Sequence, residues 1–371
     1  MNKLNSNKKA QVTVFIIIGI LLLVGAATFF YIAKTTSQES KLEAEIKIAE
    51  EQVPTQFNSI KKYANDCAYS VAVDGLKLIG KQGGYVSFDG NRLNKEVFAT
   101  RLNPTESDAV SFTSNSDLKT AYWYYLKSAS NCNDDCDFAS RRPALRETDN
   151  SIEIQLERYV DAKYKDCINN FEPFVEQGFI ITEESSPETN VVIAADDVKV
   201  LVDYKITAKI QDAESEISKF LVTIPIDLEN IYEFATKITN MQIETSFIED
   251  FAVELISAFS GVEENNLPPT SEFRFDLGGS TVWTRSEVKA RITEMLAAHI
   301  QLFQVDGSYN YERNIFDTSL RQSIYDSTII PIANESFSNL AASFSYLNFW
   351  PIYLDMNCDG ELCRFQSIRI G

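Results

Sequence analysis

Six cysteines are the side chains of this 371-residue chain best suited to form a covalent link or a metal site. They are Cys67, Cys132, Cys136, Cys167, Cys358 and Cys363. A zinc site would require four well-spaced Cys or His ligands, and the chain has one histidine and no CxxC pair. An even number of cysteines favours disulfides in an oxidising compartment. We expect Cys132 to pair with Cys136 and Cys358 with Cys363, which leaves Cys67 for Cys167.

A partial calcium-loop pattern overlaps the last two cysteines in the stretch DMNCDGELC. Asp355, Asn357, Asp359 and Gly360 match positions 1, 3, 5 and 6 of such a loop, but Gln366 replaces the bidentate Glu at position 12. The alternative is a β-hairpin in which Asp-Gly supplies the turn and the two cysteines clasp the strands. We favour the hairpin and keep Asp355, Asn357 and Asp359 as weak calcium candidates; no other cofactor is expected.

No recognisable catalytic set accompanies the single histidine. His299 in MLAAHIQLF has no Cys, Ser or carboxylate partner at a recognisable spacing, so we expect it to pack on a helix. The sequence lacks GxSxG, HExxH, P-loop and GxGxxG motifs, and we expect no enzyme. A net charge of −19 argues against nucleic acid as a partner. Asn334 begins an N-glycosylation sequon, which fits an exported domain.

The elements that would position these residues follow an apolar N-terminus. The stretch KKAQVTVFIIIGILLLVG begins an uncharged run from Gln11 to Ala33, long enough as a helix to span the ~30 Å hydrocarbon core of a bilayer. Lysines precede the run and glutamates follow it, so the positive-inside rule places the N-terminus in the cytoplasm. We expect a basic cytoplasmic leader over residues 1–10, a single transmembrane helix over 11–34 and an extracellular C-terminal ectodomain.

The junction KKA followed by QVTVF resembles the class III, prepilin-type signal of archaeal type IV pilins. This resemblance implies cleavage between Ala10 and Gln11 that leaves the apolar helix on the mature protein. Phe15 departs from the bacterial pilins, which carry Glu at the fifth mature position. A plain signal anchor with a chance KA-Q junction is the alternative. CAYSVAVDGLKLIGKQGGY, KYKDCINNF and IYEFATKITNMQIE further resemble uncharacterised membrane-anchored surface proteins of small-genome archaea, which have no established activity.

The resemblance implies a membrane-anchored archaeal cell-surface protein, pilin-like, that acts in filament assembly or adhesion. Its partners would be the membrane and, through the N-terminal helix, further copies in a homo-oligomer or filament. The alternative is a single-pass anchored ectodomain that binds a ligand or partner without polymerising.

The pattern of apolar residues predicts an α+β fold. A long N-terminal helix (transmembrane plus stalk) would continue as an amphipathic helix over 35–82, with a kink at Pro54 or a restart whose first turn is PTQF. It would lead into a disulfide-stapled head with an antiparallel sheet and several amphipathic helices. We expect an irregular and helical subdomain over 83–175 and an α+β ectodomain over 176–371. Within them, helices are predicted at about 151–170, 228–259 and 285–303, and three or four strands between about 179 and 226.

Overall fold

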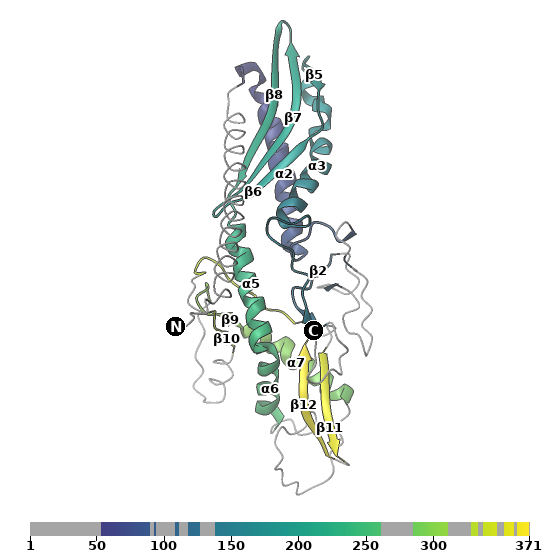
Figure 1. Cartoon of the computed structure of the whole chain (residues 1–371), viewed down its shortest axis with the longest axis vertical. Helices are drawn as coiled ribbons and strands as arrows, with labels where there is room; N and C mark the ends of the chain where they lie inside the picture. The colour runs from purple at the N-terminus through teal and green to yellow at the C-terminus, as the bar shows by residue number, and fades with distance from the viewer. Residues whose placement is uncertain are drawn as a thin grey trace, which may run out of the picture. The chain divides into compact units, whose positions relative to one another are not determined.

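A computed structural model describes residues 53–89, 93, 108–110, 118–126, 138–260, 285–310, 328–332, 337–346, 352–359 and 362–370 (Figure 1). These residues divide into two compact units. Of the described residues, the first unit contains 53–68, 164–190 and 200–222, and the second contains the others.

A four-stranded sheet is built around β7 (Val198–Ile210). Its neighbours are β5 (Ile180–Glu183), β6 (Glu188–Ile193) and β8 (Ala213–Ile224). β5 runs antiparallel to β7, from Ile180 opposite Lys209 to Glu183 opposite Ile206. Only two residues connect β7 to β8, and so short a connection can join only antiparallel strands.

The two faces of β7 have different environments because side chains alternate along a strand. Its even-numbered residues are buried: Val198, Val200, Val202, Tyr204, Ile206 and Ala208. Tyr204 contacts Tyr164 at the end of α3 (Ile152–Ile168), with ring centroids 5.8 Å apart. On the other face, Lys205 pairs with Glu184 at 3.2 Å and with Glu216 at 3.0 Å. The sheet therefore has one apolar face and one charged face.

The first described helical turn follows Pro54, where the sequence predicts a kink or a restart of the helix. Pro54 is extended (φ −52°, ψ 141°), a short 3-10 helix η1 covers Thr55–Phe57, and α2 spans Asn58–Lys81. The predicted stripe of apolar residues is buried on α2, including Ile60, Ala64 and Cys67. Gly83, with φ of 67°, follows the helix. The N–H of Gly84 donates a hydrogen bond to Ile79 O at 2.8 Å and so caps the C-terminal end of the helix.

The fold class predicted from the sequence is wrong in its main feature, the long N-terminal helix. In the part of the chain that the structure describes, no helix is both long enough and apolar enough to cross a membrane. The predicted transmembrane segment 11–34 and the stalk up to residue 52 lie outside the described residues. The described residues combine helices and a sheet, with a disulfide between Cys67 and Cys167.

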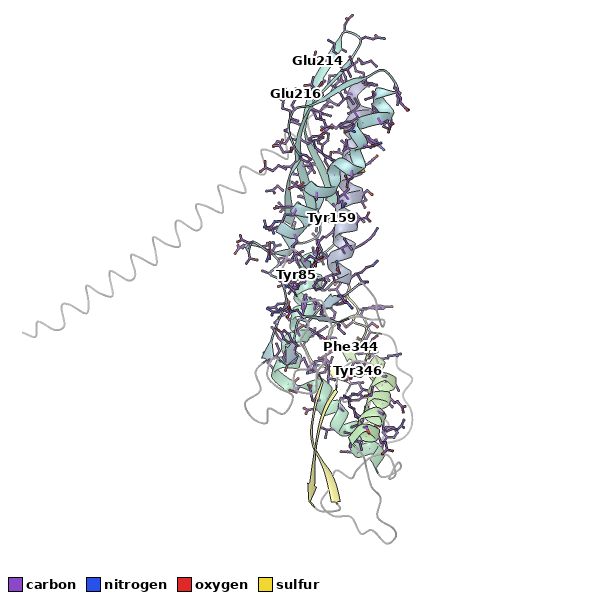
Figure 2. All side chains as sticks on the ribbon, turned by 90° about the vertical axis from the view of Figure 1, so that its right-hand side faces the viewer. Tyr85, Tyr159, Glu214, Glu216, Phe344 and Tyr346 are labelled. Carbon is purple, nitrogen blue, oxygen red and sulfur yellow. A yellow bond between two sulfur atoms is a disulfide. The ribbon has the colours of Figure 1, made fainter. Side chains whose placement is uncertain are left out.

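The second unit has its main core around three helices. They are α5 (Leu228–Thr245), α6 (Phe247–Ser260) and α7 (Arg285–His299), followed by 3-10 helix η4 (Ile300–Leu302). The sequence predicts one helix over 228–259, but Ser246 adopts a left-handed conformation (φ 50°) and separates α5 from α6. Phe303 is buried at the centre, with its ring 4.8 Å from Phe251 and 5.5 Å from Phe344, which Figure 2 labels.

Short elements complete the described chain. Two-stranded pairs form between β1 (Ala109–Val110) and β2 (Thr120–Ala121), β3 (Tyr125–Leu126) and β4 (Phe138–Ala139), and, in parallel, β9 (Gln304–Val305) and β10 (Ile329–Ile330). β11 (Ile352–Asp359) and β12 (Leu362–Ile370) form an antiparallel hairpin. Between α3 and β5 lie 3-10 helix η3 (Asn169–Phe171) and α4 (Glu172–Val175).

Candidate functional site at the interhelical disulfide

Cys67 on α2 and Cys167 on α3 form a disulfide. Their Cα atoms are 5.7 Å apart and the bond closes a sequence separation of 100 residues. This is the pair that the sequence leaves after the short-range cysteines are matched. The bond joins the two helices that cover the buried face of the sheet, and Cys67 is buried. A link over so long a loop restricts the unfolded chain and stabilises the folded state by about 4.7 kcal/mol in the loop-entropy model.

Aromatic side chains enclose the end of α3 beside this bond. The hydroxyl of Tyr63 donates to the carbonyls of Cys167 (3.2 Å) and Ile168 (3.3 Å), two of the last four of the helix, which have no partner within it. The Tyr63 ring lies 5.4 Å from Phe174 and 6.2 Å from Phe171. The hydroxyl of Tyr164 donates to Ala64 O at 3.2 Å. Burial raises the pKa of Tyr164 well above its usual value, so this hydroxyl keeps its proton.

The backbone is strained directly after the disulfide. Asn169, Asn170 and Phe171 have φ values of 45°, 51° and 54°, in the left-handed region that non-glycine residues rarely adopt. Asn169 donates to the Glu172 carboxylate at 2.7 Å, and Phe171 is fully buried. These contacts and the adjacent disulfide hold the turn in place.

Two carboxylates of α3 cover the edge of β6. Glu157 accepts a hydrogen bond from Val191 N–H (3.0 Å), and Glu153, one helical turn earlier, accepts one from Ile193 N–H (3.2 Å). Burial raises the pKa of both carboxyl groups above the usual value, and the backbone hydrogen bonds offset part of that rise. Sequence reasoning missed both residues, because Glu at this spacing is typical of a solvent-exposed helix face.

Arg146 provides a third contact to the same strand. Its guanidinium donates to Ile193 O and to Glu229 Oε1 of α5, the latter at 2.7 Å. The hydrogen bond from Arg146 lowers the pKa of Glu229 below its usual value. Backbone groups at the β6 edge are thus paired by side chains, which denies this edge to another strand.

His299 packs as a helix residue. Its Nδ1 lies 2.8 Å from Met295 O one turn earlier, and its ring is 5.7 Å from that of Phe259. Among the described residues, no group of three or more His, Cys, Asp or Glu side chains could hold a metal ion.

The C-terminal candidates lie in the β11–β12 hairpin. Cys358 and Cys363 are directly opposite each other in its register, and Asp355, Asn357 and Asp359 lie along β11. The favoured hairpin is thus present in the backbone; the side chains of these residues lie outside the described part. The other candidates also fall outside it: Ala10, Gln11, Cys132, Cys136 and Asn334.

Comparison of the chain with protein-family models gives no match, and comparisons with curated proteins and with solved structures give none either. The functional argument therefore rests on the chain's own residues.

Proposed function

We propose that this chain is an exported cell-surface protein, anchored by its apolar N-terminus, that acts in adhesion or filament assembly and not in catalysis. The Cys67–Cys167 disulfide is the observation that carries the proposal. Disulfides of this kind persist in oxidising compartments and are rare in reducing ones.

Three further features support the proposal. The uncharged run from Gln11 to Ala33 and its basic flank are suited to membrane insertion with the N-terminus in the cytoplasm. The resemblance of the KKA-QVTVF junction to archaeal prepilin signals favours assembly among surface functions. The charged face of the sheet, with Lys205 between Glu184 and Glu216, suits exposure to solvent.

The cysteine state tests export directly. The protein is isolated from cells that make it, alkylated without reductant, digested and mapped by mass spectrometry. We expect a cross-linked peptide pair containing Cys67 and Cys167 and no alkylation at either residue. Complete alkylation of both thiols in protein handled without reductant would overturn the proposed location.

The mature N-terminus and the assembly state test the finer part of the proposal. Intact mass should show an N-terminus at Gln11 if prepilin-type processing occurs, whereas retained Lys8 and Lys9 would contradict it. Electron microscopy of cells should then show filaments that carry the protein. A processed protein that stays monomeric in detergent, with no filaments on cells, would favour the ectodomain that binds a partner without polymerising.

A further inference from the structure

The β11–β12 hairpin has one apolar face and one mainly polar face in its register. Residues opposite each other in an antiparallel pair lie on the same face, and the faces alternate along each strand. One face holds only apolar residues and the two cysteines: Ile352 with Ile370, Leu354 with Ile368, Met356 with Phe365, and Cys358 with Cys363. The other face holds Tyr353 with Arg369, Asp355 with Ser367, Asn357 with Arg364, and Asp359 with Leu362.

A β-bulge keeps this pattern in phase. The register shifts by one residue at Gln366 of β12. Strict alternation would otherwise place Ile368 on the face opposite to Cys363. Because the apolar face continues across the bulge, a slip of one residue would mix the two faces, so the pattern fixes Cys358 opposite Cys363.

The short connection defines how the two cysteines are paired. β11 ends at Asp359 and β12 begins at Leu362, so only two residues connect the strands. The residues that flank a two-residue connection exchange both backbone hydrogen bonds, and bonded and non-bonded pairs then alternate along the ladder. Cys358 and Cys363 are therefore a non-hydrogen-bonded pair, in which the Cα atoms of a regular ladder lie about 4.5 Å apart.

This separation is at the short end of the range for a disulfide. The Cα atoms of bonded cysteines are about 4.4–6.8 Å apart, most often about 5.5–6 Å. Cys67 and Cys167, at 5.7 Å, have the commonest separation. A bond between Cys358 and Cys363 departs from it, and such a departure makes a disulfide easier to reduce.

The two pairs also differ in what their bonds hold together. Cys67–Cys167 closes a sequence separation of 100 residues between two helices, so its reduction frees a long loop. The strands that carry Cys358 and Cys363 are already paired along the hairpin, so reduction there frees only the turn. The second pair also lies beside the turn of the hairpin labelled β11 and β12 in Figure 1, where a ladder opens more readily than at its middle. It can therefore open and close while the hairpin stays folded.

We propose that Cys358 and Cys363 form an exchangeable disulfide at which a thiol of another molecule binds covalently, whereas Cys67–Cys167 holds the fold. A thiolate attacks the Sγ atom of one cysteine, the Cys358–Cys363 bond breaks, and the other cysteine leaves as a thiolate. A mixed disulfide with the second molecule results. Attack by a second thiolate then joins the two thiols as a disulfide and releases the pair reduced by two electrons and two protons. The inference concerns one hairpin, so it stands whether or not the protein assembles into filaments.

Glutathione is a thiol probe that compares the two pairs within one molecule. The oxidised full chain is equilibrated at neutral pH with graded values of [GSH]²/[GSSG], and free thiols are alkylated and mapped by mass spectrometry. We expect Cys358–Cys363 to be half reduced at a value at least about 10-fold lower than Cys67–Cys167 requires. Equal values, earlier reduction of Cys67–Cys167, or no bond between Cys358 and Cys363 in the oxidised protein would overturn the proposal. Reduced thiols throughout the protein as isolated would contradict only the export proposal, because the oxidised chain can be prepared with GSSG.

Paired variants locate the exchange, with biotin-labelled glutathione as the probe. Cys358→Ser with Cys363→Ser should lower labelling of the oxidised protein by at least about 10-fold. Cys132→Ser with Cys136→Ser removes the same number of thiols from another expected pair and should change labelling by less than about 2-fold. Both variants keep Cys67 and Cys167. Equal losses, or a greater loss in the second variant, would assign the exchange to other cysteines and overturn the proposal.

A protein probe distinguishes the source of the thiol. A thioredoxin variant that keeps only its attacking cysteine forms a trapped mixed disulfide with an accessible disulfide. A cross-linked product that requires Cys358 and Cys363 would indicate a protein partner, and labelling by glutathione alone would indicate a small thiol. Reaction with neither probe would show that the pair is not an exchange site.

Discussion

In the first unit, the first turns of α2 and the last turn of α3 are joined covalently through Cys67 and Cys167, with aromatic rings around the bond. In the second unit, the core of α5, α6 and α7 consists of packed apolar side chains such as Phe251, Leu296 and Phe303. A disulfide stabilises chiefly by restricting the unfolded chain, whereas apolar packing stabilises the folded state directly. The stability of the first unit should therefore depend on redox conditions, and that of the second core on its side-chain volume.

Removing the disulfide should produce the largest effect. Cys67→Ser with Cys167→Ser releases the loop, and we expect the free energy of unfolding of the first unit to fall by about 4–5 kcal/mol. Amide hydrogen exchange should show lost protection at the start of α2 and the end of α3, with α7 unchanged. An equal loss of protection in α7 would contradict the separation of the two units.

A substitution that removes a large side chain from the core of the second unit tests the other half of the comparison. Phe303 is 1% exposed and contacts Phe247, Phe251 and Phe344, so Phe303→Ala should cost about 3–5 kcal/mol through lost contacts and a cavity. The loss should appear in hydrogen exchange of α6 and α7. Reductant should not change the size of this loss. A loss that depends on reductant would contradict the proposed difference between the two units.

The close contact of α2 with α3 at Gly75 gives a smaller effect. A Cβ on this residue would lie 2.6 Å from Leu156 Cδ1 and 2.8 Å from Tyr159 Cδ1. Gly75→Ala should therefore lower the free energy of unfolding by about 1–2 kcal/mol, because overpacking exceeds the gain in helix propensity. Gly80→Ala on the same helix meets nothing within 4 Å and should stabilise by up to about 1 kcal/mol in urea unfolding. Destabilisation by both variants would contradict the steric explanation.

The carboxylates at the β6 edge give a pH-dependent effect. Folding raises the pKa of Glu153 and Glu157 above the usual value of 4.5, chiefly through burial, so the folded state binds protons more tightly than the unfolded state. Their contribution to stability should therefore fall as the pH rises above about 4.5. Glu153→Gln with Glu157→Gln should remove this fall, because the amide oxygen still accepts the N–H but cannot ionise.

Urea unfolding at several pH values between 4 and 8 measures this difference. Glu157→Ala, which also loses the hydrogen bond to Val191, should cost about 1 kcal/mol near pH 4 and less at higher pH, because the variant lacks a group whose contribution falls as the pH rises. An unchanged pH slope in the Gln double variant would show that other groups cause it.

A surface ion pair on α2 should give the smallest effect. Lys62 and Asp66 are 3.1 Å apart but their side chains are 78% and 65% exposed. Lys62→Ala should therefore change the free energy of unfolding by less than about 0.5 kcal/mol in the same assay. A loss above about 1 kcal/mol would mean that the charged surface of α2 contributes to the first unit as the disulfide does.

The sequence predicts much of the fold because its patterns are local. The predicted helix at 151–170 corresponds to α3, the Val- and Ile-rich segments correspond to the sheet, and the Asp-Gly pair predicts the β11–β12 hairpin. The break between α5 and α6 could not be predicted, since Ser246 is neither Gly nor Pro and its left-handed conformation depends on tertiary packing. The long N-terminal helix was predicted from hydrophobic length and helical periodicity, whereas no helix among the described residues is long and apolar enough to match it. The kink or restart predicted at Pro54 agrees with the helical turns that begin after this residue.

The candidate sites were predictable to a lesser extent. The cysteine positions indicate the Cys67–Cys167 pair, because the two expected short-range pairs leave only these two cysteines. A groove along α5, in the second unit, depends on Ile332, which is distant in sequence. The contacts of Glu153 and Glu157 with β6 likewise arise only when the strand is in place.

The long loop closed by the disulfide has a consequence for how the protein is made. Cys67 is synthesised 100 residues before Cys167, a delay of roughly 5–20 s at ordinary rates of translation, and Cys132 and Cys136 follow it before its partner does. If the chain meets an oxidant as it emerges, Cys67 encounters two wrong thiols first. Correct pairing then requires thiol–disulfide exchange after Cys167 has appeared, so the yield of native protein should depend on a disulfide isomerase.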